Sequence, residues 1–160
     1  MKQIRPLAAL AVVTFVLSFT AQARQSKAGP AQPNPPVVVY SSAGAGSNRP
    51  LSDVVRVDHT LYLSGRLGTD DSGKLVAGGI AAETKQTMEN IRAALEKNGS
   101  SLDQVVKCTV MLADIKEWAD MNAVYVTFFK KDRLPARSAF GTGGLVLGAR
   151  VEIECIAFVK

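Results

Sequence analysis

The chain has 160 residues, of which 47% are hydrophobic and 21% charged, and it carries a formal net charge of +5 at pH 7. This length suits one domain with a buried core. Acidic residues are interspersed among the basic ones, and Lys130, Lys131 and Arg133 form the one local basic cluster. The charge pattern therefore does not predict a nucleic-acid-binding surface.

Residues 1–23 have the pattern of an export signal. Lys2 and Arg5 form a short positive region, residues 7–19 are an apolar segment, and Ala21-Gln22-Ala23 is a small-x-small cleavage site. The apolar segment is too short to cross a hydrocarbon layer of about 30 Å, so a membrane anchor is the weaker interpretation. We expect an exported protein, periplasmic or secreted, with no membrane contact after the signal is cleaved.

Residues 24–52 are rich in proline, glycine and serine, a composition typical of a flexible tether. An added edge strand over residues 37–40 is the alternative for that part of the tether. We expect the folded domain to cover residues 53–160.

The hydrophobic pattern of this domain predicts the element order β-β-α-β-α-β-β. A hairpin is expected from Val54 to Arg66, with Asp58-His59 in its turn. Helices are expected over residues 81–97, where Gly99 follows in the usual C-terminal position, and over residues 115–131. Between them, residues 105–112 alternate as a strand.

Each of these elements has one apolar side. In the first helix this side carries Thr84, Met88, Ile91 and Leu95; in the middle strand Val106, Cys108, Val110 and Leu112; in the second helix Trp118, Met121, Tyr125, Phe128 and Phe129. The aromatic stripe of the second helix is interpreted as core packing rather than as a cofactor site.

Two helices and five or six strands predict an α+β two-layer sandwich, with both helices on one face of a mixed sheet. In the closing strand, residues 150–160, Glu152 and Glu154 alternate with Val151, Ile153 and Cys155. The glutamates share the uncovered sheet face with Ile156, Phe158 and part of the Arg137 segment, and this face is too apolar to remain in water. The pattern therefore predicts self-association through the uncovered face.

His59, Cys108 and Cys155 limit the available chemistry. His59 is the only histidine, so the sequence offers no two-histidine metal site, no Cys/His zinc cluster and no Ser-His dyad. The two cysteines lie on strands and face the helices. Export permits a disulfide, but we favour buried free thiols, because a bridge requires Cα atoms within about 7 Å of each other.

Arg137 stands out in an otherwise apolar run, two residues after Pro135. Its guanidinium and the carboxylates of Glu152 and Glu154 need partners, because an unpaired buried charge is unfavourable. Two interpretations stay open on the residues alone. The charges pair with one another, or they leave room for a small charged guest.

Short motifs across residues 50–160 follow the order of a known family. They are Pro50 through Asp53, Leu61-Tyr62-Leu63-Ser64-Gly65, Met88-Glu89-Asn90-Ile91, Asn122-Ala123-Val124-Tyr125, Phe128-Phe129, Leu134-Pro135-Ala136-Arg137-Ser138 and Val151-Glu152-Ile153-Glu154. On these motifs the chain resembles the RidA (YjgF-type) reactive-intermediate deaminases. The resemblance does not cover the signal or the tether.

The resemblance implies a chorismate-mutase-like fold, a homotrimer with ligand sites at the subunit interfaces, and hydrolysis of 2-imino or 2-enamino acids to 2-oxo acids and ammonia. It implies no metal and no organic cofactor. Arg137 would bind the substrate carboxylate through two parallel hydrogen bonds, and Glu152 would hold a water and take its proton. Gly65 and Ala139, through backbone groups, and Asn122 would complete the substrate site.

Some positions depart from the family pattern. Leu51 stands where many relatives have a tyrosine, Ala139 where a cysteine is frequent, and Val146 in place of a common proline. These changes leave carboxylate capture intact and leave the substrate's identity open.

The alternative function is a trimeric small-carboxylate-binding or chaperone-like protein, in which Arg137 holds a ligand or serves assembly only. Ribonuclease activity has no histidine pair or aromatic-basic groove to support it.

Overall fold

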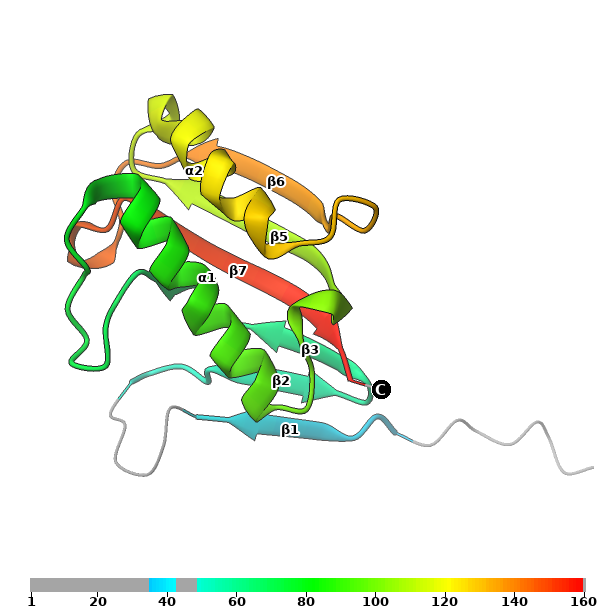
Figure 1. Cartoon of the computed structure of the whole chain (residues 1–160). Coiled ribbons are helices and arrows are strands. Elements are labelled where there is room, and N and C mark those ends of the chain that lie inside the picture. The colour runs from blue at the N-terminus through cyan, green and yellow to red at the C-terminus, as the bar shows by residue number, and fades with distance from the viewer. Residues whose placement is uncertain (1–34, 43–48, 160) are drawn as a thin grey trace, which may run out of the picture. The chain divides into compact units, whose positions relative to one another are not determined.

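The computed structural model describes residues 35–42 and 49–159. The predicted signal, residues 1–23, and residues 24–34 and 43–48 of the predicted tether lie outside this part. The described residues form one seven-stranded sheet with helices α1 and α2 on the same face (Figure 1). The predicted α+β two-layer fold is confirmed. No helix in the described ranges is long and apolar enough to span a bilayer.

The sheet is mixed but mostly antiparallel. Its strand order is β1-β2-β3-β7-β5-β6, and β4 pairs separately with β7. The strands are β1 Val38–Ser41, β2 Val54–Val57, β3 Thr60–Leu63, β4 Arg66–Leu67, β5 Val105–Leu112, β6 Ala136–Gly141 and β7 Val151–Phe158. Only the β5–β6 pair among these strands is parallel. The central strand β7 therefore joins the N-terminal hairpin to the C-terminal half of the sheet.

Strand β1 lies at the edge of the sheet and pairs antiparallel with β2, where Val39 is opposite Arg56. It corresponds to the edge strand that the sequence left as an alternative within the tether. The sheet therefore begins before the predicted domain boundary at Asp53.

Helix α1 (Gly79–Lys97) forms where the apolar spacing predicts it. Its predicted inner residues, Thr84, Met88, Ile91 and Leu95, are all buried. At its C-terminus Gly99 adopts a left-handed φ of 75°. The Gly99 N–H donates to the carbonyl of Glu96 and the Ser100 N–H to that of Leu95, which satisfies the last carbonyl groups of the helix.

The second helical segment is shorter and less regular than the predicted span of residues 115–131. It consists of a 3-10 turn at Ile115–Glu117, helix α2 (Trp118–Tyr125) and a second 3-10 turn at Val126–Phe128. Met121 and Tyr125 are fully buried, as the aromatic stripe predicted. Trp118 is 40% exposed, so its assignment to the core was wrong.

A bulge in β5 changes the residues that face the core. The register of β5 against β7 shifts between Val105 and Lys107. Val105 is buried as a result, whereas Val106, predicted to be internal, is 40% exposed. An extra residue in one strand reverses the alternation on one side of it, and the local sequence pattern does not reveal where this happens.

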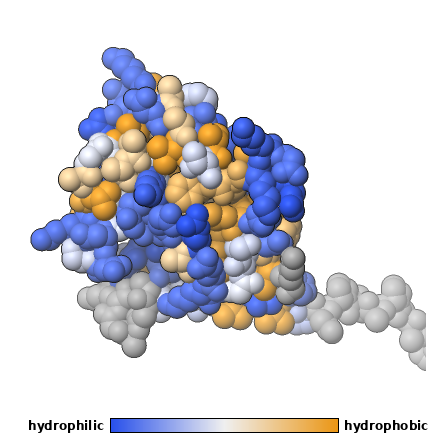
Figure 2. Space-filling view, in the orientation of Figure 1, coloured by the Kyte–Doolittle hydropathy of each residue, from blue (hydrophilic) through white to orange (hydrophobic). Residues whose placement is uncertain are grey.

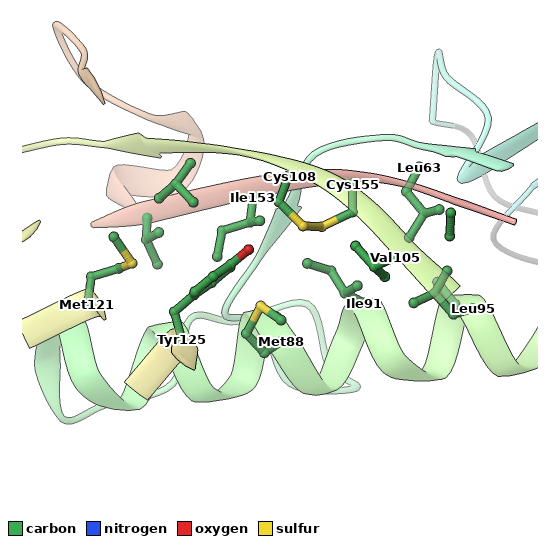
Figure 3. Close-up of a cluster of buried hydrophobic side chains, with 14 of the residues drawn as sticks. Leu63, Met88, Ile91, Leu95, Val105, Cys108, Met121, Tyr125, Ile153 and Cys155 are labelled. Carbon is green, nitrogen blue, oxygen red and sulfur yellow. A yellow bond between two sulfur atoms is a disulfide. The ribbon is translucent and has the colours of Figure 1, made fainter. Parts of the chain in front are cut away.

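Cys108 and Cys155 form a disulfide between the adjacent strands β5 and β7. They are direct register partners, with Cα atoms 4.1 Å apart, so the prediction of free thiols was wrong. Figure 3 shows the bridge within the core, above the Met88 and Ile91 side chains of α1. The distance between the two Cα atoms depends on the register of β5 against β7, and the sequence around neither cysteine specifies that register.

Within the described ranges, no residues cover the sheet face opposite the helices in the single chain, as predicted. It carries Glu152, Glu154, Ile156 and Phe158 of β7, with Tyr62 of β3 opposite Ile156 and 47% exposed. Figure 2 views the chain from the helix side, where polar and apolar residues are intermixed. The uncovered face thus combines exposed aromatic side chains with carboxylates.

Candidate functional site

Strand β6, an edge strand of the sheet, carries Arg137. This residue is the register partner of Cys108, which in turn partners Cys155, and both cysteines point to the helices. The Arg137 side chain therefore lies on the helix face, and of this segment only the alternate residues Ser138 and Phe140 lie on the uncovered face where part of it was predicted. Its guanidinium carbon is 5.5 Å from the ring centroid of Trp118 and 4.7 Å from that of Tyr125. Both rings come from α2, two helical turns apart on the same side.

The Arg137 guanidinium has no protein carboxylate beside it within the described ranges. One of its terminal nitrogens is buried and has no hydrogen-bond partner among these residues. An unsatisfied buried donor is unfavourable by about 1–3 kcal/mol, more when the group is charged. The geometry therefore leaves Arg137 able to bind a carboxylate from outside the chain.

Ala139 lies two residues further along β6, on the same face as Arg137. The Thr142 N–H donates to the Leu112 carbonyl of β5. Because backbone groups alternate in direction along a strand, the N–H groups of residues 137, 139 and 141 point away from β5, toward the open edge. The contribution expected of Ala139 needs only its backbone N–H. It therefore does not require the cysteine side chain that is frequent at this position in the family.

Asn122 shares the α2 face that contacts Arg137, because it lies between Trp118 and Tyr125 at helical spacing. Its side-chain oxygen is buried and has no hydrogen-bond partner among the described residues. The buried Tyr125 hydroxyl also lacks one. The structure thus gathers Arg137, Ala139 and Asn122, together with the two rings, into one group, here called the arginine half-site.

Glu152 and Gly65 form a second group, here called the glutamate half-site. Gly65 lies where the chain passes from β3 to β4, which both pair with β7. A Cβ placed on Gly65 would lie 1.9 Å from a carboxylate oxygen of Glu152. The absence of a side chain at position 65 therefore makes room for this carboxylate.

The environment of Glu152 disfavours its charged form. Partial burial is the main cause and the nearby carboxylate of Glu154 adds to it, so the pKa of Glu152 is raised above its ordinary value of 4.5. A carboxyl with a raised pKa is better suited than an ordinary one to accept and return a proton near neutral pH.

A cleft of about 770 Å³ opens beside Glu152 and Gly65. Leu51, Val146 and Leu147 contribute exposed aliphatic side chains to its lining, and Leu147 is 63% exposed. The cleft's charged lining includes Arg66, which forms an ion pair with Asp53 at 3.1 Å. Burial lowers the pKa of Arg66, and the charge of Asp53 opposes that effect.

The two half-sites do not meet within one chain. Arg137 lies on the helix face and Glu152 on the uncovered face, because Glu152 alternates with the buried Val151 and Ile153. On β5, the register partner of Arg137 is Cys108 and that of Glu152 is Met111. The positions of Arg137 and Glu152 therefore differ by about 10 Å along the direction of that strand. An ion pair between Arg137 and Glu152 or Glu154 of the same chain is therefore excluded.

Sequence reasoning missed Trp118 and Tyr125 as neighbours of Arg137, because the aromatic stripe of α2 was assigned wholly to the core. It also missed Leu147 as part of the cleft lining. The spacing of Trp118, Asn122 and Tyr125 on one helix face was the available signal. In the described ranges, no group of three His, Cys, Asp or Glu side chains converges on a common point that could hold a metal.

Comparison with known proteins agrees with the resemblance. A family model described as Endoribonuclease L-PSP matches residues 43–159. A bovine protein named 2-iminobutanoate/2-iminopropanoate deaminase is 48% identical over 121 residues, which cover 75% of this chain and 88% of the bovine chain. The human protein of the same name is 41% identical over 121 residues, with the same two coverages.

Solved structures show the same fold. The structure of RidA from an Antarctic Psychrobacter species is 37% identical, has a TM-score of 0.66, and is matched over 75% of this chain and 94% of that one. Yeast Mmf1 is 32% identical with a TM-score of 0.69, over 78% of this chain and all of that one (100%). Fold and site thus define a small α+β protein of the chorismate-mutase-like class. Within that class, the chain belongs to the RidA (YjgF-type) family, as its motifs predicted.

Proposed function

We propose that the protein hydrolyses 2-imino and 2-enamino acids to 2-oxo acids and ammonia. The observation that carries this proposal is the Arg137 guanidinium at an open sheet edge, where one buried nitrogen lacks a partner among the residues that the structure describes. Its planar fork matches the carboxylate that every 2-imino acid carries. The names of the bovine and human relatives, both 2-iminobutanoate/2-iminopropanoate deaminases, support this choice of substrate class.

The active site would form between subunits of a homotrimer. Arg137 and Glu152 lie on opposite sheet faces, so a single substrate reaches both only if they come from different copies of the chain. The uncovered face supports association, because it exposes Tyr62 and Phe158 to water in the single chain. Each interface would then bring the arginine half-site of one copy to the glutamate half-site of the next.

The chemistry needs one water and one residue that moves protons. A protonated imine carbon is already electrophilic, so the site mainly orients the substrate and places the water. Glu152 would take a proton from the water as its oxygen bonds to the imine carbon, giving a carbinolamine. Glu152 would return the proton to nitrogen, the C–N bond would break to release ammonia, and the ammonia would take the hydroxyl proton as the 2-oxo group forms. Iminium and water are thereby converted to 2-oxo acid and ammonium.

We also propose that the protein is exported, as the signal pattern of residues 1–23 predicts. The Cys108–Cys155 disulfide supports this location, because structural disulfides persist mainly in oxidising compartments such as the periplasm or the extracellular space.

An amino-acid oxidase that generates imino acids in the assay tests the activity. The wild-type protein should accelerate ammonia release, and Arg137→Ala should abolish the gain. Arg133→Ala, which removes an exposed arginine from the same segment, is the matched control and should behave as wild type. If the wild-type protein gives the same rate as buffer but still binds small carboxylates, the non-catalytic binding function replaces the enzyme.

A further inference from the structure

Arg137 has a different environment from the other arginines of the described ranges that contact aromatic rings or form ion pairs. Arg66 and Arg150 form ion pairs with Asp53 and Glu117, and Arg92 contacts Phe128 but also pairs with Glu89. Arg137 has aromatic rings beside it and no carboxylate from the described part of the chain. The position of the Arg137 guanidinium therefore depends on its ring contacts and on its own side-chain conformation, and not on an ion pair.

Ring contacts suit a guanidinium that must bind a ligand. An aromatic face attracts a cation within about 6 Å of its centroid, and it does so without occupying the N–H donors at the edge of the guanidinium. A carboxylate neighbour would occupy those donors and would have to be displaced by the substrate. The contacts with Trp118 and Tyr125 therefore restrict a long, flexible side chain and leave its fork available.

The two rings differ in what else they do. Tyr125 is buried, packs on Phe129 with ring centroids 5.0 Å apart, and lies in the hydrophobic core (Figure 3). Its removal would damage the fold as well as the site. Trp118 begins α2, is 40% exposed, and is not part of the core cluster. A substitution of Trp118 would remove its contact with Arg137 and would disturb the core less than a substitution of Tyr125.

We propose that Trp118 is a positioning residue, which holds the Arg137 guanidinium in the orientation that captures the substrate carboxylate. This inference rests on the proposed function, because it takes the carboxylate of a 2-imino acid as the ligand of Arg137. Trp118 acts through Arg137 and takes no part in the proton transfers assigned to Glu152. Its loss should therefore weaken substrate binding and leave the chemical step unchanged.

Steady-state kinetics on three substitutions test this role. Trp118→Ala and Trp118→Leu should raise KM about three- to tenfold, with kcat within about twofold of wild type, because they remove a cation–π contact of ordinary strength. Trp118→Phe should restore most of the lost affinity. Leucine keeps apolar bulk without a π face, so the Leu and Phe variants separate the cation–π contact from simple packing.

Asp120→Ala is the matched control, since it removes an exposed side chain from the first turn of the same helix, on the side away from Trp118. It should leave KM unchanged, and all variants should unfold at temperatures close to that of the wild type. An active wild-type protein whose KM is the same in Trp118→Ala and Trp118→Leu would overturn the inference while leaving the proposed function in place.

Fluorescence gives an independent measurement, because Trp118 is the only tryptophan in the chain. Titration with propanoate, a simple carboxylate without an imine, should change its emission saturably in the wild type and not in Arg137→Ala. If the wild type releases no ammonia above buffer, the proposed function fails. The fluorescence titration then decides the inference, and an unchanged emission at saturating propanoate overturns it.

Discussion

The arginine and glutamate half-sites lie on opposite faces of one sheet, and their surroundings differ. Arg137 is at a sheet edge, where two aromatic rings contact its guanidinium and leave its N–H donors available. Glu152 is on a central strand, where partial burial and Glu154 disfavour its negative charge. The first environment suits an anion receptor and the second a proton carrier. The contrast teaches that one chain keeps the two half-sites apart, so the proposed function would join binding to proton transfer only in an assembly.

The largest expected effect comes from removing the proton carrier. Glu152→Gln keeps the size and polarity of the side chain but cannot take a proton, so kcat should fall about 10²- to 10⁴-fold while KM changes little. Steady-state kinetics of imine hydrolysis measure both values. A raised KM with unchanged kcat would instead show that Glu152 acts in substrate binding. The two half-sites would then not differ in role.

The same substitution should not weaken the fold. Because the pKa of Glu152 is raised in the folded state, its contribution to stability is present at low pH and is lost as the pH rises through that pKa. A glutamine stays neutral, so the variant does not lose stability as the pH rises. Thermal unfolding of Glu152→Gln at neutral pH should therefore occur at the wild-type temperature or above it.

A mixing experiment tests whether the half-sites belong to different copies. Arg137→Ala and Glu152→Gln should each be inactive alone. If they are unfolded together and refolded as mixed oligomers, some interfaces receive one intact half-site from each variant. Random assembly should restore about a quarter of wild-type activity, since each site needs one chain of each kind in a fixed order. No recovery in verified mixed oligomers would mean that the half-sites do not act across subunits.

The disulfide connects the strands on which the two half-sites depend. Cys108 is on β5, the neighbour of the Arg137 strand, and Cys155 is on β7, the strand of Glu152. Replacing both cysteines by alanine should lower the free energy of unfolding by about 2–4 kcal/mol. Denaturant unfolding under oxidising conditions measures this change. Equal stability of the wild type with and without a reductant, together with accessible free thiols, would contradict a formed bridge.

The smallest expected effect concerns Glu154. Glu154→Gln removes the negative charge that helps raise the pKa of Glu152, so that pKa should fall toward its ordinary value and stay above it because of burial. Side-chain carboxyl chemical shifts, followed by NMR across the pH range, measure the titration directly. The acidic limb of kcat/KM should move to lower pH in parallel. An unchanged titration would show that burial alone sets the pKa.

Local periodicity was enough for much of the fold. The helical spacing of Thr84, Met88, Ile91 and Leu95 predicted the buried side of α1, and Gly99 predicted its end. Alternation along β7 placed Glu152 and Glu154 on the uncovered face. These features follow from backbone geometry over a few residues, which is why one chain segment suffices to predict them.

The composition of the site could be predicted only in part. Arg137 and Glu152 were identified by their motifs, but the face that Arg137 occupies was not. That face depends on the parallel register that sets Arg137 beside Cys108, and β6 lacks a clear apolar alternation of its own. Trp118 was missed because a helical stripe does not reveal how far the core extends along it.

The sequence by itself determined the order of the main elements from β2 to β7, the α+β class and the family, and it supplied the charged candidates for the site, but it did not separate β4 from β3. Tertiary structure alone decided that Cys108 and Cys155 are bridged, that Val105 replaces Val106 in the core, and that Arg137 faces aromatic rings rather than the glutamates. The physical reason is the range of the interactions. Helix and strand periodicity is local, whereas strand register joins residues far apart in the chain.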